Sequence, residues 1–189
     1  MRGLFELDAP AAKGSAIISE CGLYRYRLER RTSVGPCGRV AAVIMANPST
    51  ADADTDDATI RKGLGFAERN DIGQLIVGNK FAFRATDIKA SRTAPDPVGP
   101  ENDRHLEAIM REDDFHLVAW GPLSKLPPNL RTRWRAVARI AERVGCRLHA
   151  LATAQCGHPK HRLMLSYHCM PAPWVSAPPF PLNEEEARW

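Results

Sequence analysis

The chain has 189 residues, of which 44% are hydrophobic and 25% charged, and its 26 lysines and arginines exceed its 22 aspartates and glutamates by four. This size and composition fit one globular domain with a sizeable core, and they exclude a wholly disordered or collagen-like chain. The longest apolar run, residues 40–46, is far shorter than the roughly 18 residues that a membrane span needs. We therefore expect a soluble protein that does not enter a membrane.

Extended and helical patterns alternate along the first part of the chain. Residues 23–28 place two tyrosines between two arginines, which predicts a half-exposed strand. Residues 40–46 are continuously apolar, as in a strand that is buried on both faces. Asp56 and Asp57 can then cap a helix whose apolar positions follow 3.6-residue spacing, and this helix should end near Asn70.

The rest of the chain repeats this alternation. The expected elements are strands at 75–77, 115–120 and 147–151, a helix from Pro100 through Met110, and a helix over 130–144. Connections of this length join parallel neighbours, since hairpins join only antiparallel strands. The sequence therefore predicts an α/β fold of three αβα layers, with a mainly parallel four-stranded sheet and an added antiparallel N-terminal strand.

The chain divides into three parts by composition. We expect an N-terminal extension over residues 1–20, a single α/β domain over 21–170 and a proline-rich C-terminal arm over 171–189. The arm has five prolines between residues 171 and 181, a density that forbids helix. Its aromatic residues favour packing against the domain or a second chain, and they are Trp174, Phe180 and Trp189.

Polar clusters follow four of the expected strands. They occupy residues 47–52, 79–87, 120–122 and 156–162. Ligands of parallel α/β sheets bind beyond the carboxyl ends of the strands, so we expect the clusters to meet in one cavity. Asn, Ser, Thr, Asp and Pro also form ordinary turns. Four members of the clusters are not turn formers, and these are Arg84, Lys160, His161 and Arg162.

Several of these motifs together resemble a bacterial family of domains of unknown function, catalogued as number 1643. The motifs are Tyr24-Arg-Tyr-Arg-Leu-Glu-Arg, Asn47-Pro-Ser-Thr-Ala-Asp, Thr59-Ile-Arg-Lys, Asn79-Lys-Phe-Ala-Phe-Arg-Ala-Thr-Asp, Asp96-Pro-Val-Gly-Pro-Glu-Asn-Asp, Ala119-Trp-Gly and Gly157-His-Pro-Lys-His. The resemblance covers about residues 22–168. The family name carries no activity.

The order of the motifs also resembles, more distantly, the uracil-DNA glycosylase superfamily, which hydrolyses the bond between a flipped base and its sugar. This resemblance implies that Asn47 and Asp52 position the attacking water and that His158 stabilises charge on the base. It implies that Asn79 reads the base, with Phe81 as a candidate for stacking on it. The other substrate-binding candidates are Ser49, Arg84, Lys160, His161 and Arg162, of which Arg84, Lys160 and Arg162 would hold phosphates.

Two further hypotheses remain open at this point. The two glycines of the glycosylase motif are replaced here by Met45 and Ser49, which favours a module that binds a nucleotide or nucleic acid without cutting it. Carboxylates in the loop from Asp52 to Asp57 could instead serve a metal-assisted enzyme that transforms phosphates. Cys156, His158 and His161 lack a fourth zinc ligand at a recognisable spacing, so we expect no metal and no cofactor.

Location and partner follow from the cysteines, the N-terminus and the arginines. The five cysteines are odd in number and scattered, which favours reduced thiols. Residues 1–20 also lack the pattern of a secretory signal, so we expect a cytoplasmic protein. Twenty of the 26 basic residues are arginines, which suits DNA or a nucleotide as the partner. A high-GC genome would give the same bias.

Overall fold

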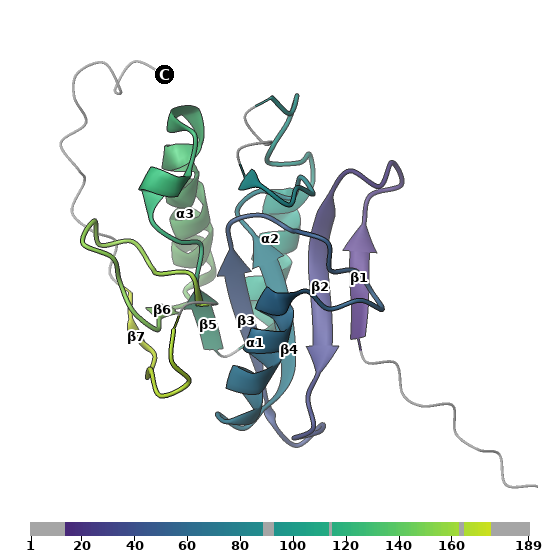
Figure 1. Ribbon diagram of the computed structural model, residues 1–189, viewed down its shortest axis with the longest axis vertical. Helices are drawn as coiled ribbons and strands as arrows, with labels where there is room; N and C mark the ends of the chain where they lie inside the picture. The colour runs from purple at the N-terminus through teal and green to yellow at the C-terminus, as the bar shows by residue number, and fades with distance from the viewer. Residues whose placement is uncertain (1–13, 89–92, 114, 163–164, 175–189) are drawn as a thin grey trace, which may run out of the picture.

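The computed structural model describes residues 14–88, 93–113, 115–162 and 165–174 (Figure 1). The strands are β1 (Gly14–Ile18), β2 (Arg25–Arg31), β3 (Arg39–Met45), β4 (Ile72–Asn79), β5 (Phe115–Val118), β6 (Leu148–Ala150) and β7 (Ala172–Pro173). The helices are α1 (Ala58–Glu68), α2 (Asn102–Glu112) and α3 (Trp134–Val144), with 3-10 turns at Leu123–Lys125 and Pro128–Arg133. No helix among the described residues is long and apolar enough to cross a membrane.

The strands form one mixed sheet in the order β1-β2-β4-β3-β5-β6-β7. The four central strands, β4, β3, β5 and β6, are parallel neighbours, while β1, β2 and β7 are antiparallel to the strands beside them. The α/β class and the parallel strands predicted from the apolar runs are therefore confirmed. β3 is the centre of the sheet and is buried from Ala41 to Met45, as its continuous apolar run predicts.

Helices pack against both faces of the sheet (Figure 1). On one face, Ala42 and Ile44 of β3 join a core cluster with residues of α2 and α3. On the other face, Val43 and Met45 join a cluster that includes Ile60 of α1. Successive side chains of a strand point to opposite faces, so β3 contributes to both cores.

Strand β2 differs from its prediction as a half-exposed strand. It lies between β1 and β4 rather than at an edge, and Arg25, Arg27 and Arg30 are buried, with 1%, 9% and 2% of their surface exposed. β1, which comes from the stretch expected to be an N-terminal extension, pairs along β2, so β2 is not an edge strand. The arginine side chains are buried by groups on the faces of the sheet: Arg30 by the loop before α1, and Arg27 by Glu112 of α2. The Tyr-Arg alternation is a real period of two, but both faces of the strand are covered.

The helix boundaries follow the capping residues. Asp57 is the N-cap of α1, and its carboxylate accepts a hydrogen bond from the Ile60 backbone N–H at 2.8 Å, as predicted. α2 begins at Asn102, two residues after Pro100, because the intervening residues form a turn that starts at Gly99 with a positive φ of 89°.

The first residues of the expected C-terminal arm complete the sheet. β7 pairs with β6, and Trp174 is 7% exposed, with its ring edge-on to Trp120 at a centroid distance of 5.1 Å. Its indole N–H donates to the Gly157 carbonyl at 2.9 Å. The expected packing of Trp174 on the domain is confirmed, while Phe180 and Trp189 lie outside the described residues.

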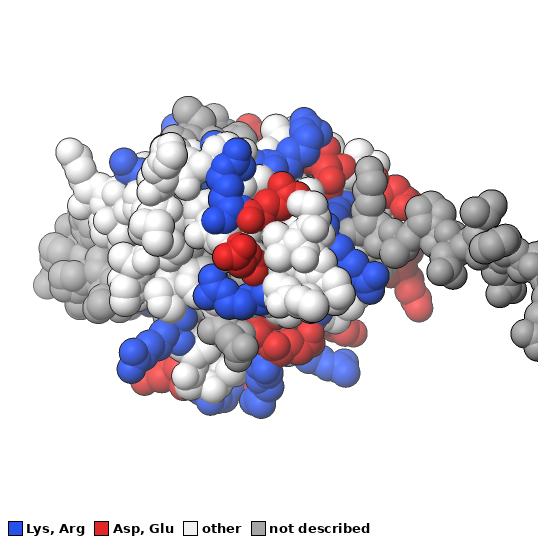
Figure 2. Space-filling view, turned by 90° about the horizontal axis from the view of Figure 1, so that it is seen from below, with Lys and Arg blue, Asp and Glu red and all other residues white. Residues whose placement is uncertain are grey.

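Charges are mixed at the end of the sheet where the parallel strands begin. Figure 2 views the molecule from this end, and it shows lysines and arginines interspersed with aspartates and glutamates. Such a surface has no extended field of one sign to attract a charged partner.

Candidate functional site

A cavity of about 760 Å³ lies at the carboxyl end of β3. Its walls come from the end of β3 and the turn after it, from the first residues of α1, and from the loops around residues 86–88, 120–126 and 154–161. Trp120, Leu126 and Met45 provide an apolar wall, whereas Lys125 and Lys160 add positive charge. A volume of this size suits a small-molecule ligand such as a nucleoside or nucleotide.

The cavity brings together part of the predicted site. Asn47, Ser49, Lys160 and His161 line it, although the first two follow β3 and the last two come more than 100 residues later. Six predicted site residues do not line it, namely Asp52, Asn79, Phe81, Arg84, His158 and Arg162. Each of the four strand-end clusters nevertheless contributes at least two residues to the cavity, as expected, although six of the ten predicted side chains do not line it.

Asn47 ties two loops together at the cavity wall. Its side-chain amide N–H groups donate to the backbone carbonyl of Ala85 at 2.6 Å and to that of Pro48 at 3.2 Å. The side-chain Oδ1 has no hydrogen-bond partner among the residues that the structure describes. The amide is thus held by its nitrogen, and its oxygen is left as an acceptor for a ligand or water.

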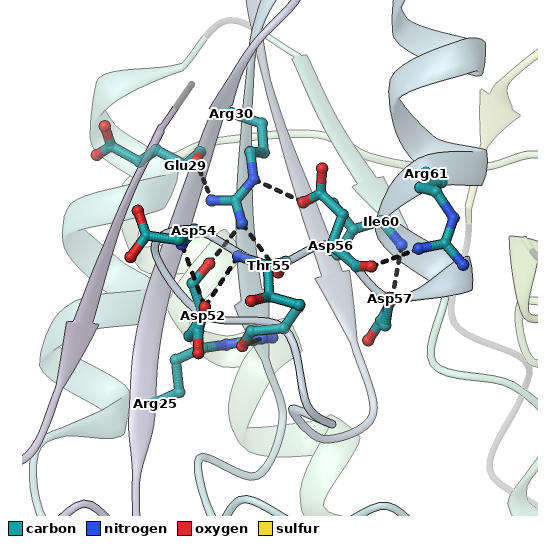
Figure 3. A network of polar contacts seen from close by, with 11 residues as sticks. Arg25, Glu29, Arg30, Asp52, Asp54, Thr55, Asp56, Asp57, Ile60 and Arg61 are labelled. Carbon is teal, nitrogen blue, oxygen red and sulfur yellow. Dashed lines mark hydrogen bonds and ion pairs between the residues drawn. The ribbon is translucent and has the colours of Figure 1, made fainter. Parts of the chain in front are cut away.

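The acidic loop between β3 and α1 is held together by its own carboxylates and by Arg30 (Figure 3). Asp52 accepts hydrogen bonds from the backbone N–H groups of Thr55 at 2.9 Å and Asp54 at 3.1 Å, and these bonds lower the pKa of its carboxyl group. Asp56 forms an ion pair with Arg30 at 2.7 Å. Across the described ranges, no group of three His, Cys, Asp or Glu side chains is arranged to hold a metal ion.

The other predicted residues are engaged elsewhere. Asn79 is buried, and its Oδ1 accepts from Arg25 Nη2 at 3.3 Å. Phe81 is fully buried against Leu126 and Leu130. Arg84 donates to the Gly22 carbonyl at 3.3 Å, which connects it to the turn before β2.

His158 is buried below the cavity instead of lining it. Its ring lies 5.1 Å from that of Trp134 and 6.1 Å from that of Trp174, measured between centroids. Burial, together with the nearby charge of Lys80, lowers the pKa of His158 to about 4. The imidazole is therefore neutral at pH 7. Burial also lowers the pKa of His161, which does line the cavity.

The model of one protein family matches residues 25–163, which is most of the chain. The chain belongs to the DUF1643 family. That family is described as a protein of unknown function. Comparison with curated proteins and with solved structures finds no match.

Every residue that lines the cavity of this DUF1643 protein falls inside the matched stretch, from Arg25 at its start to His161 near its end. The cavity is therefore part of the family's domain rather than of the segments that flank it.

Arg25 lines the cavity of the DUF1643 domain but was not among the predicted site residues. Its guanidinium donates to the Ala51 carbonyl at 2.6 Å and to Asn79, and its Nε has no partner among the described residues. The Tyr-Arg alternation predicted a half-exposed strand with Arg25 partly in solvent, so Arg25 was not predicted to line a site. The one signal available was its position at the start of a strand that runs antiparallel to β4, which places it near the carboxyl end of β4.

Lys80 is a second buried cation that the sequence prediction missed. It directly follows β4, has no exposed surface, and its Nζ has no hydrogen-bond partner among the described residues. The ammonium lies 5.2 Å from the centroid of the Trp120 ring and 5.7 Å from that of Phe81. Burial, helped by the charge of Arg133, lowers the pKa of Lys80 to about 7. Lys80 therefore lies beside Trp120, which forms part of the cavity wall.

Proposed function

We propose that this protein binds a nucleotide or nucleobase in the cavity at the carboxyl end of β3. The observation that carries the proposal is the composition of this cavity, whose lining combines aromatic and apolar side chains with cationic ones. A flat base suits the wall that contains Trp120 and Leu126, and a phosphate suits the side with Arg25 and Lys160. Asn47 Oδ1 and Ser49 offer hydrogen bonds to a base edge.

The cavity also has the location that ligands favour in parallel α/β sheets, outside the carboxyl ends of the strands. Lysine and arginine exceed aspartate among its lining residues, because Arg25, Lys125 and Lys160 face Asp57 and Asp87. This binding role needs only residues that line the cavity. It does not require Asp52 or His158, which lie elsewhere.

Isothermal titration calorimetry with nucleosides, nucleoside monophosphates and short single-stranded oligonucleotides tests this proposal. Ser49→Phe, which fills the cavity, should weaken binding at least about 10-fold, since ligand and side chain compete for the same volume. Ser33→Phe is the matched control, because Ser33 is exposed in the loop between β2 and β3, at the other end of the sheet. Equal affinity for both variants, or no binding by the unmodified protein, would refute the proposal.

A second candidate is hydrolysis of the bond between base and sugar, in a three-layer fold like that of the uracil-DNA glycosylases. Its supporting observation is the Asn47 side chain, whose nitrogen is fixed by Ala85 and Pro48 and whose oxygen remains available to orient a water. In this hypothesis the neutral imidazole of His161, which lines the cavity, takes the part first expected of His158.

Oligonucleotides that carry damaged or modified bases test the hydrolase. Asn47→Ala should abolish formation of abasic product. Asn70→Ala is the control, because the Asn70 amide also donates to a backbone carbonyl, that of Phe66 at 2.8 Å, but at the far end of α1. If Asn47→Ala released base at the normal rate, or if the unmodified protein released none, hydrolysis would be ruled out and binding alone would remain.

A further inference from the structure

Two buried guanidinium groups lack a carboxylate partner. Arg25 and Arg162 are 1% and 3% exposed, and neither forms an ion pair with a described residue. Arg25 Nε, and Arg162 Nε and Nη2, have no hydrogen-bond partner among the described residues. Burial lowers the pKa of each to about 10, so both remain charged at pH 7. A buried charge without a partner is strongly unfavourable, so an anion at this position would stabilise both groups.

Both guanidinium groups lie near the N-terminus of α1. Arg25 lines the cavity together with Asp57, Ala58 and Thr59, where α1 begins. Arg162 directly follows His161 in the chain and packs against Gly63, one turn after Thr59. A Cβ at position 63 would collide with this guanidinium, so the glycine makes room for it. Arg162 does not itself line the cavity, but its neighbour His161 does, and Gly63 lies one helical turn from Thr59 of the cavity wall. The negative charge of Asp57 acts on both guanidinium groups.

The first turn of α1 adds N–H donors to this position. The N–H groups of a helix's first turn have no acceptor within the helix, and the helix dipole favours an anion there. The Asp57 carboxylate accepts from Ile60, and Ala58 and Thr59, whose N–H groups have no acceptor within the helix, line the cavity. The charges of Arg25, Arg162 and Lys160 exceed those of Asp57 and of Asp52, which also acts on Arg25. The position therefore keeps an excess of positive charge.

We propose that Arg25, Arg162 and the first turn of α1 bind the phosphate group of a nucleoside monophosphate. This inference rests on the proposed nucleotide binding and assigns the end of the cavity that holds the phosphate. A phosphate monoester offers several acceptor oxygens, and guanidinium groups bind such oxygens through two parallel N–H bonds. The phosphate would supply the acceptors that the unpartnered N–H groups of Arg25 and Arg162 lack.

Calorimetry with a nucleoside, its 5′-monophosphate and inorganic phosphate alone separates this inference from the function on which it rests. The monophosphate should bind at least about 10-fold more tightly than the nucleoside, since charge-assisted hydrogen bonds are among the strong ones. Inorganic phosphate should compete with the monophosphate but not with the nucleoside. Binding of nucleoside and monophosphate with equal affinity would overturn the phosphate site and leave the nucleobase cavity intact.

Matched variants distinguish a ligand role from a structural role. Arg25→Met and Arg162→Met should each remove the preference for the monophosphate and keep nucleoside affinity. Arg27→Met is the control, because Arg27 is buried in the same strand but pairs with Glu29 and Glu112, and it should retain the preference. Thermal unfolding of each variant verifies that it is folded. A full preference for the monophosphate in both folded variants would overturn the site.

Asp57→Asn tests the same site with a substitution that should strengthen phosphate binding rather than weaken it. Asparagine is as good an N-cap as aspartate, so α1 keeps its first turn. The substitution removes the negative charge that acts on both guanidinium groups, so inorganic phosphate should bind several-fold more tightly. Asp54→Asn, in the same loop and exposed, should leave phosphate affinity unchanged. Weaker phosphate binding by Asp57→Asn would contradict the proposed position. If these substitutions change phosphate affinity as expected but nucleosides do not bind, the anion site is supported and nucleotide binding is refuted.

Discussion

The buried arginines of this protein fall into two groups with opposite surroundings. Arg27 and Arg30, in β2, are paired: Arg27 donates to Glu29 at 2.5 Å and to Glu112 at 2.6 Å, and Arg30 donates to Asp56 at 2.7 Å. Arg25 and Arg162, near the start of α1, have no such carboxylate partner among the described residues. Paired arginines join parts of the fold, whereas unpaired ones cost stability unless a ligand supplies the anion.

The two groups also differ in what they hold. Arg30 donates to the backbone carbonyls of Glu29 at 2.8 Å and Thr55 at 3.2 Å, and to that of Asp52, so it fixes the acidic loop in front of α1 (Figure 3). Among the described residues, Arg25 donates to one backbone carbonyl, that of Ala51, and to the side-chain Oδ1 of Asn79, whereas Arg162 packs against a glycine. If the comparison is correct, substitutions in the first group lower stability, and those in the second change binding.

The largest loss of stability is expected for Arg30→Met. The change removes the ion pair with Asp56 and the hydrogen bonds from Arg30 to three backbone carbonyls, so the free energy of unfolding should fall by about 3 kcal/mol. Urea denaturation followed by circular dichroism measures it. Arg31→Met is the control, since Arg31 is the exposed neighbour in the same strand. A loss below about 1 kcal/mol would mean that Arg30 does not hold the loop.

Lys80 extends the comparison to a buried cation whose charge depends on pH. Its pKa is about 7 in the folded protein against an ordinary value of 10.5, so the unfolded chain binds more protons between these values. Stability should therefore rise with pH above about 7 and level off near 10.5, by up to about 1.4 kcal/mol per pH unit. Below about pH 7 the lysine is charged in both states and its burial costs most.

Lys80→Met isolates this contribution. Methionine keeps the apolar contacts with Trp120 and Phe81, so the variant should be more stable than the unmodified protein at pH 6, with the difference shrinking towards pH 10. Melting temperatures at a series of pH values measure the difference. Lys62→Met is the control for removal of a cation, because Lys62 is in α1 and its ammonium lies over the Tyr167 ring. A difference that did not vary with pH would show that Lys80 is not titrating near neutrality.

The sequence predicts the elements of this fold better than their surroundings. β3 and the Asp57 cap of α1 follow from local patterns, because an apolar run and a capping carboxylate act within a few residues. The burial of Arg25 depends on the loop before α1 and on the end of β4, because its guanidinium reaches the Ala51 carbonyl and the Asn79 side chain. The period of two in residues 23–28 shows that alternate side chains point to opposite faces of the strand, but it does not show what packs on each face.

The candidate site shows the same division. Asn47 and Lys160 follow strand ends and lie in the cavity, as the rule for parallel sheets predicts. His158 is two residues from Lys160, yet it turns inward onto Trp134 and Trp174. Which residue of a loop faces a cavity depends on the geometry of the loop and on aromatic residues that are distant in the sequence. One of these aromatic residues, Trp174, belongs to a segment that the sequence predicted to be a C-terminal arm. A position at a strand end therefore identifies a segment, not a side chain.

Gly63 and Arg162 test the second group of arginines directly. Gly63→Ala should destabilise the unmodified protein by about 1 kcal/mol, because the methyl group meets the buried guanidinium. In an Arg162→Met background the same change should stabilise by about 0.5–1 kcal/mol, since alanine favours helix over glycine. The coupling between the two sites is measured by urea denaturation of the four proteins. Additive effects would show that Gly63 does not make room for Arg162.

The smallest effect on stability is expected for Arg25→Met, and its size is the sharpest test of the comparison. The substitution loses hydrogen bonds to Ala51 and Asn79, but it also removes an unpaired buried charge, so the two changes should offset each other to within about 1 kcal/mol. Urea denaturation in buffer with and without phosphate measures the change in stability caused by the substitution and the stabilisation by phosphate. Phosphate should stabilise the unmodified protein, because a ligand that binds only the folded state raises its stability, and it should stabilise Arg25→Met much less. If Arg25→Met lost as much stability as Arg30→Met and kept the full phosphate effect, Arg25 would belong with the structural arginines, and the distinction between the two groups would disappear.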